Sequence, residues 1–323
     1  MHEEKAAILA YSALPALALA LPALGAACAA AAGEGRARLR NWAAVASTGA
    51  TLAVVAALLA RVLARGPVYF NLDIMRIGDR FVGNLEVDAM GALFAFFASV
   101  LWFAASLHAF RYMDHEHKRT RFFLFMLLTQ SATLGVFMVQ DFFTLYLFFE
   151  AMGLLAYLLV IHSETERARA AATKYICMTV VGGLSLIGGV FLYLGYAGTV
   201  AFRPLAESPW LAGSFKVVAL AALIAGFGVK AGMVPLHIWL PDAHPAAPSP
   251  ASALLSGVMI KAGAYGIIRT LLSFLQQPAA HAAEAEAVGG AHGAEGAAHA
   301  AGGLVSNLQA LGMVVILIAV ATM

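Results

Sequence analysis

Long apolar segments constrain the fold of this chain more than any other feature of its sequence. Hydrophobic residues make up 62% of its 323 residues, and charged residues only 12%. A helix needs about 20 mostly apolar residues to cross the hydrocarbon core of a membrane. Nine segments meet this requirement: residues 7–32, 42–64, 87–110, 121–140, 142–162, 173–198, 214–240, 249–275 and 304–323. The sequence therefore predicts an all-α polytopic membrane protein with about nine transmembrane helices.

Composition divides the chain into four parts. Residues 1–86 hold two predicted helices and an outer loop, and the partial alternation of residues 66–86 predicts a small β-hairpin or extended loop. Residues 87–275 form the predicted transmembrane core. Residues 276–303 are mainly Ala, Gly, His and Glu, which predicts a mobile loop without a core of its own. Residues 304–323 form the last predicted helix.

Lysine and arginine in the loops predict how the chain is oriented. Basic residues gather after the first, third and fifth apolar segments, whereas the loop between the fourth and fifth has none. The positive-inside rule then predicts an inner (cell) membrane protein with its N-terminus outside. The loop after the second segment disagrees, since it also carries basic residues. The first apolar run is longer than a signal h-region and lacks a basic n-region, so we expect no cleaved signal peptide.

The sequence contains no recognisable cofactor or metal motif. Cys28 and Cys177 lie in separate predicted spans without CxxC spacing, so we expect both to be small core residues. The histidines of HAFRYMDHEHKRTR, residues 108–121, and of residues 276–303 lack metal-ligand spacing. Walker and dinucleotide fingerprints are also missing. We expect no cofactor, no metal and no nucleic-acid partner, and this chain shows no redox or hydrolytic site of its own.

Glu150, Lys230 and Lys261 lie well inside predicted spans, where a charge is costly and indicates function by default. Glu150 lies in residues 142–162, Lys230 in residues 214–240 and Lys261 twelve residues into the following span. A nearby ammonium keeps a buried carboxylate charged, so Glu150 is expected to pair with one of the two lysines. The alternative is a static ion pair that only fixes helix packing.

The span that contains Lys230 is predicted to be broken near residues 226–240. The interrupting residues are Gly226, Gly228, Gly232 and Pro235. A broken helix at membrane depth lines a cavity or is buried in protein. His237 lies within the break and can exchange protons near neutral pH, so we expect it to connect Lys230 with Lys261. The alternative is a kink that serves packing alone.

Two further residues are weaker candidates for the same path. Lys174 lies near the start of its span, where its side chain can also reach the interface. His244 lies in the proline-rich stretch PDAHPAAPSP, where a capping or hydrogen-bonding role is equally compatible with the sequence.

Two long stretches carry a resemblance to a known family. LYLFFEAMGLLAYLLV, residues 145–160, and KAGMVPLHIWLPDAHPAAPSPASALLSGVMIKAGAYGIIR, residues 230–269, resemble the antiporter-like proton-translocating subunits of complex I, Mrp antiporters and membrane-bound hydrogenases. The second stretch is most similar to the hydrogenase and formate-hydrogenlyase branch. The resemblance covers about residues 88–275 and implies one five-helix antiporter-like repeat that contains the broken helix.

The resemblance also implies roles for the charged residues. Glu150 would pair with Lys230, and Lys261 would continue a central hydrophilic axis through His237. Members of the family contain a second, inverted repeat, and this chain matches only the first. We therefore expect either that a neighbouring subunit supplies the second repeat or that this chain is a shortened variant of the family.

The leading interpretation is a proton-translocating subunit of a redox-driven, complex I-like or hydrogenase-like assembly. Its expected partners are other membrane subunits, a fragment with the second repeat, iron–sulfur or hydrogenase-like subunits, and lipid. The alternatives are a subunit of an Mrp-type Na⁺/H⁺ antiporter, a structural adapter without transport, and coupling to inorganic-carbon uptake. The choice between H⁺ and Na⁺ and the identity of the electron donor and acceptor remain open.

Overall fold

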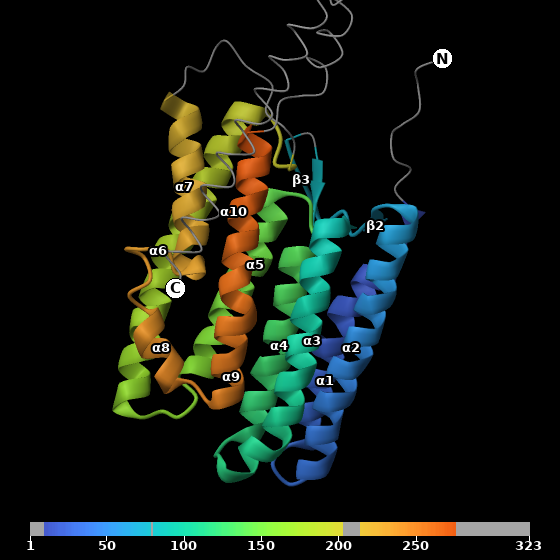
Figure 1. Ribbon diagram of the computed structural model, residues 1–323, viewed down its shortest axis with the longest axis vertical. Coiled ribbons are helices and arrows are strands. Elements are labelled where there is room, and N and C mark those ends of the chain that lie inside the picture. The colour runs from blue at the N-terminus through green and yellow to red at the C-terminus, as the bar shows by residue number, and fades with distance from the viewer. Residues whose placement is uncertain (1–9, 79, 203–213, 276–323) are drawn as a thin grey trace, which may run out of the picture.

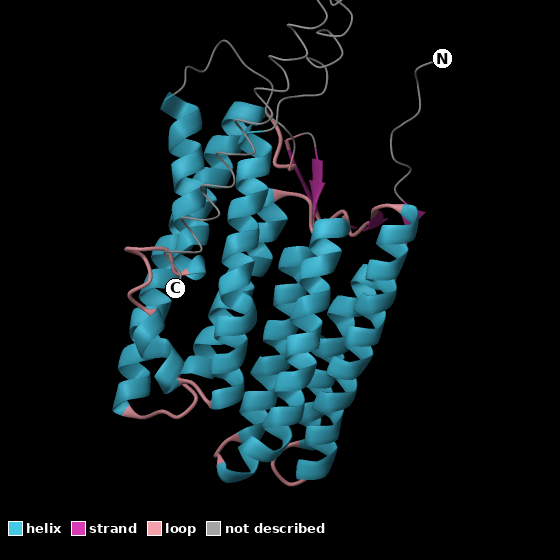
Figure 2. Ribbon diagram, viewed as in Figure 1, coloured by secondary structure: helices cyan, strands magenta, loops and turns pink. Residues whose placement is uncertain are grey.

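Seven helices among the described residues are long and apolar enough to cross a membrane, which confirms the predicted all-α membrane fold. The computed structural model describes residues 10–78, 80–202 and 214–275, with the helices side by side and roughly aligned (Figure 1). Figure 2 shows helix almost throughout, with the strands at one end only. The predicted loop over residues 276–303 and the predicted helix over residues 304–323 lie outside the described residues.

The long helices follow the predicted apolar segments closely. They are α1 (Leu14–Ala32), α2 (Ala37–Arg65), α3 (Ala89–Tyr112), α4 (Arg119–Phe137), α5 (Phe142–Val160), α6 (Glu166–Ala197) and α7 (Ser214–Ala231). The span after them is composite: α9 (Ser249–Leu254), the π-helical turn η2 (Leu255–Met259) and α10 (Ile260–Leu275). The main packing pairs are α6 with α7, α1 with α2 and α4, α4 with α5, α2 with α3, and α7 with α10.

One predicted span differs from the structure, and another is broken as predicted. In the described part of segment 7–32 the helix begins at Leu14, because Ala10–Tyr11 is the short strand β1, which pairs with β2 (Val68–Phe70). The segment 214–240 is not continuous. Helix α7 ends at Ala231, a turn follows, and the chain resumes as α8 (Leu240–Ala246).

Local sequence explains where several helices begin and where α7 ends. Asp88, Asp141 and Thr165 each accept a hydrogen bond from the backbone N–H three residues later, which caps the starts of α3, α5 and α6. Gly232 has φ +71°, a left-handed conformation that suits glycine and ends α7. Pro235 lacks the backbone N–H that a continuing helix would use.

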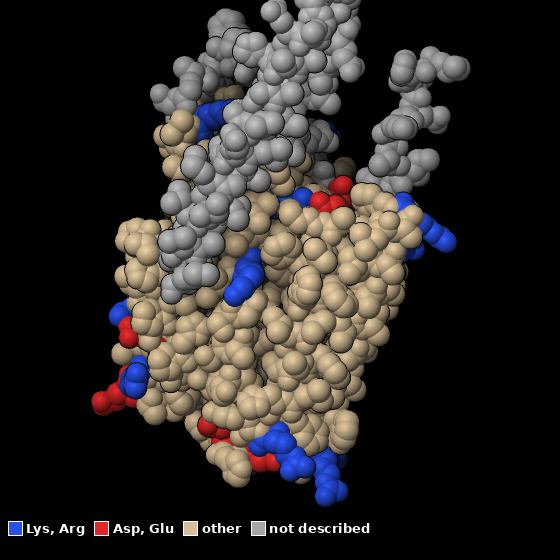
Figure 3. Space-filling view, in the orientation of Figure 1, with Lys and Arg blue, Asp and Glu red and all other residues tan. Residues whose placement is uncertain are grey.

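Short strands occupy the end of the bundle between α2 and α3, which we call the sheet side. Strands β3 (Met75–Ile77) and β4 (Arg80–Val82) form an antiparallel pair, and β2 (Val68–Phe70) pairs with β5 (Leu85–Val87). The predicted strand character of residues 66–86 is therefore confirmed. On the face shown in Figure 3, charged side chains gather mainly toward the ends of the bundle, with a wide zone of other residues between them.

The opposite end, which we call the basic side, holds a cluster between the starts of α4 and α6. Lys118 donates two 2.7 Å hydrogen bonds to Glu164, and Arg121 also pairs with this carboxylate. The buried His162 ring stacks on His117 and bonds to its carbonyl oxygen at 3.1 Å. Lys118 and Arg121 lower the pKa of Glu164 to about 2, and burial lowers the pKa of His162 to about 4.

This cluster makes the folded state sensitive to acid. His162 stays neutral in the folded chain down to about pH 4, whereas the unfolded chain takes up the proton near pH 6.5. Stability should therefore fall as the pH drops from 6.5 toward 4, and the contribution of Glu164 should be lost below its unfolded pKa, toward pH 2. The thermal midpoint of His162→Gln should depend less on pH between 6.5 and 4 than that of the unchanged protein. The exposed His108→Gln is the matched control, and an unchanged slope in His162→Gln would contradict this assignment.

Candidate functional site

Lys230, near the C-terminal end of α7, is a buried cation with only 3% of its surface exposed. Its ammonium donates hydrogen bonds to the hydroxyl of Tyr175 at 2.6 Å and to the hydroxyl of Thr179 at 2.9 Å. Both partners lie on α6, four residues apart and so on one face of that helix. The Tyr175 hydroxyl donates in turn to the carbonyl oxygen of Gly153 on α5, at 3.1 Å. Three helices therefore surround this amine.

Glycines make room for both charged groups. A methyl group at Gly153 would lie 3.1 Å from the Lys230 Nζ, and one at Gly183 would lie 2.7 Å from the Glu150 carboxylate. The Lys230 ammonium thus packs over a glycine of α5, and the Glu150 carboxylate of α5 packs over a glycine of α6. Glu150 and Lys230 interact electrostatically. Within the described part of the chain, no ion pair of 4.0 Å or less joins them.

Aromatic rings complete the surroundings of the ammonium. The Lys230 Nζ lies 4.0 Å from the centroid of the Tyr175 ring and 5.8 Å from that of Trp239. Trp239 belongs to the turn that follows α7, and its indole donates to the carbonyl oxygen of Val229 at 2.7 Å. Sequence reasoning missed Tyr175, Thr179 and Trp239. The hydroxyl pair at i and i+4 within an apolar span was the signal for the first two.

One of the predicted histidines lies in the turn before α8 and the other lies on α8 itself. His237 is half-buried in the turn before α8, and its Nδ1 is enclosed without a hydrogen-bond partner among the described residues. His244, on α8, shares a 3.2 Å hydrogen bond with the Ser252 hydroxyl of α9. His244 therefore links two short helices, the hydrogen-bonding role that the sequence left open.

Lys174 pairs with Asp242 at the surface of the bundle. Their side chains are 46% and 47% exposed, and the pair joins α6 to α8. Lys174 lies next to Tyr175 in the sequence, but its ammonium is outside the site that holds Lys230.

Lys261 lies on the outer surface of the described bundle, in the middle of the span Ser249–Phe274. Its ammonium donates to the carbonyl oxygen of Ser256 at 2.7 Å, within the π-helical turn. Gly263 packs closely against Ala231 of α7, with 2.5 Å from its would-be Cβ to the Ala231 nitrogen. Residues two apart on a helix point about 200° apart, so Lys261 points away from α7.

The two cysteines are not core residues, contrary to the sequence prediction. Cys28 and Cys177 are both exposed on the surfaces of their helices. Apolar and small side chains on a membrane helix can face lipid as well as protein, so composition alone could not separate the two environments. Among the described residues, no group of three or more His, Cys, Asp or Glu side chains could hold a metal ion.

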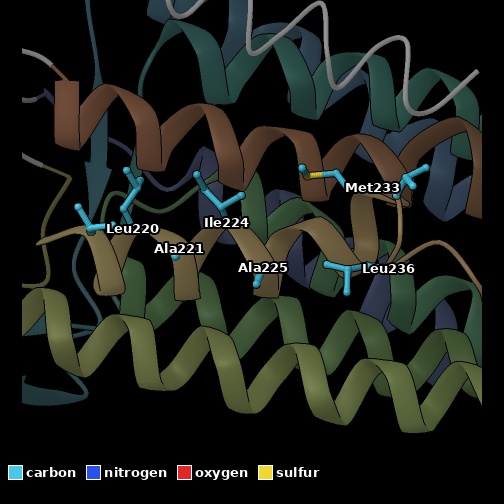
Figure 4. A pocket seen from close by; sticks show the side chains of 8 residues that line it. Leu220, Ala221, Ile224, Ala225, Met233 and Leu236 are labelled. Carbon is cyan, nitrogen blue, oxygen red and sulfur yellow. The ribbon is translucent and has the colours of Figure 1, made fainter. Parts of the chain in front are cut away.

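An apolar groove of about 400 Å³ follows α7 and the start of the turn after it (Figure 4). Its lining residues are Val217, Leu220, Ala221, Ile224, Ala225, Met233, Val234 and Leu236. These side chains carry no hydrogen-bonding group, so the groove suits a hydrocarbon surface and not an ion. The polar site around Lys230 is separate from it.

Comparison with known proteins identifies relatives of this region. Residues 139–285 match the family model described as NADH:quinone oxidoreductase/Mrp antiporter, TM. Hydrogenase-4 component B of Escherichia coli is 37% identical over 200 residues, which cover 60% of this chain and 29% of the relative. NAD(P)H-quinone oxidoreductase chain 4 1 of Picosynechococcus is 33% identical over 203 residues, 61% of this chain and 36% of the relative. The chain thus spans about a third of the length of these relatives.

Two solved structures share the fold. A chain of the archaeal membrane-bound sulfane sulfur reductase superposes with a TM-score of 0.71 and 28% identity, over 81% of this chain and 54% of that one. A chain of the Mrp complex from Dietzia gives a TM-score of 0.70 and 26% identity, over 80% and 48%. Both alignments extend over most of the described helices, so the arrangement of this bundle is one that other membrane complexes use.

Proposed function

Since the chain belongs to the antiporter-like subunit family of complex I-like, hydrogenase and Mrp complexes, we propose that it translocates protons within a redox-driven membrane complex. One observation carries the proposal. Lys230 is a buried ammonium inside a membrane bundle, held by two hydroxyls and within electrostatic reach of the Glu150 carboxylate. Burying an ammonium in a membrane protein costs free energy, so such a residue indicates a function that uses its proton.

Lys230 is the group that we propose to load and release the proton. Attraction to Glu150 favours the charged amine, and displacement of that carboxylate favours release. The released proton would move toward His237, whose ring lies in the turn after α7 and can accept it near neutral pH. Lys261 is the proposed next acceptor. Lys174 and His244 have smaller proposed roles, because each is already engaged with a neighbour.

The exposed position of Lys261 supports a membrane partner. An ammonium in the middle of a span is costly to leave in lipid, so another polar membrane segment should cover it. We propose that a neighbouring subunit supplies this cover as a second antiporter-like repeat. Iron–sulfur or hydrogenase-like subunits would provide the electrons, and lipid would surround the apolar surface. The basic side would face the cytoplasm of an inner membrane, with the N-terminus outside.

The second candidate is a subunit of an Mrp-type Na⁺/H⁺ antiporter, driven by an ion gradient. The likeness to the Dietzia Mrp structure favours it. Purification of the native complex in mild detergent, with identification of every subunit, separates the two. Iron–sulfur and hydrogenase- or quinone-type subunits would support the redox-driven pump. A set of small membrane subunits alone would favour the antiporter, and isolation without any partner would contradict both.

The glycine at position 183 provides a test of the role of Glu150. Gly183→Ala places a methyl group 2.7 Å from the carboxylate, which is the flexible end of a side chain and can move away. We expect the fold to persist while coupled proton translocation falls by about tenfold, because the charge is displaced. Gly188→Ala on the same helix is the matched control, since a methyl group there meets nothing within 4 Å. Equal rates in the two variants would argue against a role for this carboxylate.

A further inference from the structure

Because the span is broken after α7, the chain turns back and places the ring of Trp239 close to Lys230. Trp239 lies nine residues after Lys230, at the end of the turn, and its ring is 5.8 Å from the Lys230 Nζ. On the other side the ring of Tyr175 lies 4.0 Å from the same atom. The two rings are in edge-to-face contact, with centroids 5.1 Å apart. Both side chains are almost completely buried.

The turn that contains Trp239 is attached to the helix bundle at both of its ends. Its indole N–H donates to the carbonyl oxygen of Val229, the residue immediately before Lys230. Beyond it, α8 is joined to α6 by the pair of Lys174 and Asp242. The turn is therefore attached at one end to the lysine's own helix and at the other to the helix that supplies Tyr175.

We propose that Tyr175 and Trp239 form an aromatic cage for the Lys230 ammonium, and that Trp239 makes the turn after α7 responsive to the charge of that lysine. This inference rests on the proposed function. An aromatic face attracts a cation within about 6 Å, and more strongly where water is excluded. A neutral amine lacks this attraction. The attraction between Trp239 and the ammonium thus stabilises the turn against the site while Lys230 is protonated. This stabilisation is lost when the proton leaves.

The ring of Trp239 can be altered without changing any of the titratable groups near Lys230. The titratable side chains on the elements packed around Lys230 include Glu150 and Tyr146 on α5, Lys174, Tyr175 and Cys177 on α6, His237, Asp242 and His244 in or after the turn, and Lys261, Tyr265 and Arg269 on α10. Fluorinated tryptophans reduce the negative charge of the ring face and nearly preserve its shape. A series of them at position 239 therefore isolates the attraction between ring and cation.

Incorporation of mono- to tetrafluorotryptophan at position 239 of the intact complex tests the proposal. We expect coupled proton translocation to fall stepwise with fluorine number, by about tenfold across the series. Trp102 is the matched control. It is also fully buried and donates its indole N–H to a backbone carbonyl, that of Met126 at 3.0 Å, and within the described residues no cation lies over its ring. Equal responses at the two positions would overturn the cage.

A second measurement separates this inference from the proposed function. The thermal midpoint of the complex is measured for the same series in the native and Lys230→Met backgrounds. We expect fluorination at position 239 to lower the midpoint only where the lysine is present, which is a direct coupling between the two residues. Lys230→Met with normal translocation would refute the proposed function, whereas the loss of coupling in this cycle would refute the cage alone.

Discussion

Replacing Lys230 with methionine should lower coupled proton translocation by about 100-fold, the scale of a lost proton-transfer group. Methionine keeps the length and apolar character of the stem but removes the ammonium that Tyr175 and Thr179 hold. No other described side chain donates to both hydroxyls, so the charge cannot be replaced from nearby. The measurement is proton uptake by vesicles that contain the purified complex, with electron transfer recorded at the same time.

Lys216→Met is the matched control for this experiment. Lys216 lies on the same helix, close to the start of α7 and far along it from Lys230. We expect this variant to pump normally. A Lys230→Met complex that pumped at the same rate as Lys216→Met would remove the lysine from the path and with it the main support for the proposed function.

The largest expected effect on stability comes from Arg269, just past the middle of α10. Arg269 is nearly buried and donates to Asp88 at 2.6 Å and to the Tyr265 hydroxyl at 2.8 Å. Arg269→Met leaves the half-buried Asp88 carboxylate without its cation. Breaking a buried pair in this way costs about 3 kcal/mol, measured here as the free energy of unfolding in mixed micelles.

Two comparisons test this interpretation of Arg269. Asp88→Asn in the Arg269→Met background should recover part of the loss, because the amide oxygen can still cap α3 without leaving an unpaired charge. Asp242→Asn breaks the exposed pair with Lys174 and should cost at most about 1 kcal/mol. Similar costs for the buried and the exposed pair would show that burial does not determine the contribution of Arg269.

The membrane helices could be predicted from the sequence because a run of about 20 apolar residues has few other uses. The break near residues 226–240 was also predictable, since Gly232 and Pro235 each oppose a continuing helix. The start of the first helix was not, because the apolar residues before Leu14 can also serve a strand. Apolar character sets the environment of a segment but not its backbone conformation.

The candidate site was only partly predictable for a different reason. Charge inside an apolar span identifies Lys230, Glu150 and Lys261 individually, whereas their neighbours depend on how the helices are rotated. The hydroxyl pair at i and i+4 marks Tyr175 and Thr179 as polar residues of one helix face. It does not show that Lys230 bonds to them or that Lys261 points outward. The glycines at positions 153 and 183 are informative only once their opposing side chains are known.

The π-helical turn at Leu255–Met259 determines the direction in which Lys261 points. It adds one residue relative to a regular α-helix and so offsets the residues that follow by about 100° around the axis. If one residue of this turn were deleted, α10 would rotate relative to α9. Either α9 would keep its packing against α3, or α10 would keep both Gly263 against α7 and Lys261 on the outer surface. One inserted residue thus lets a single span serve two interfaces with different registers.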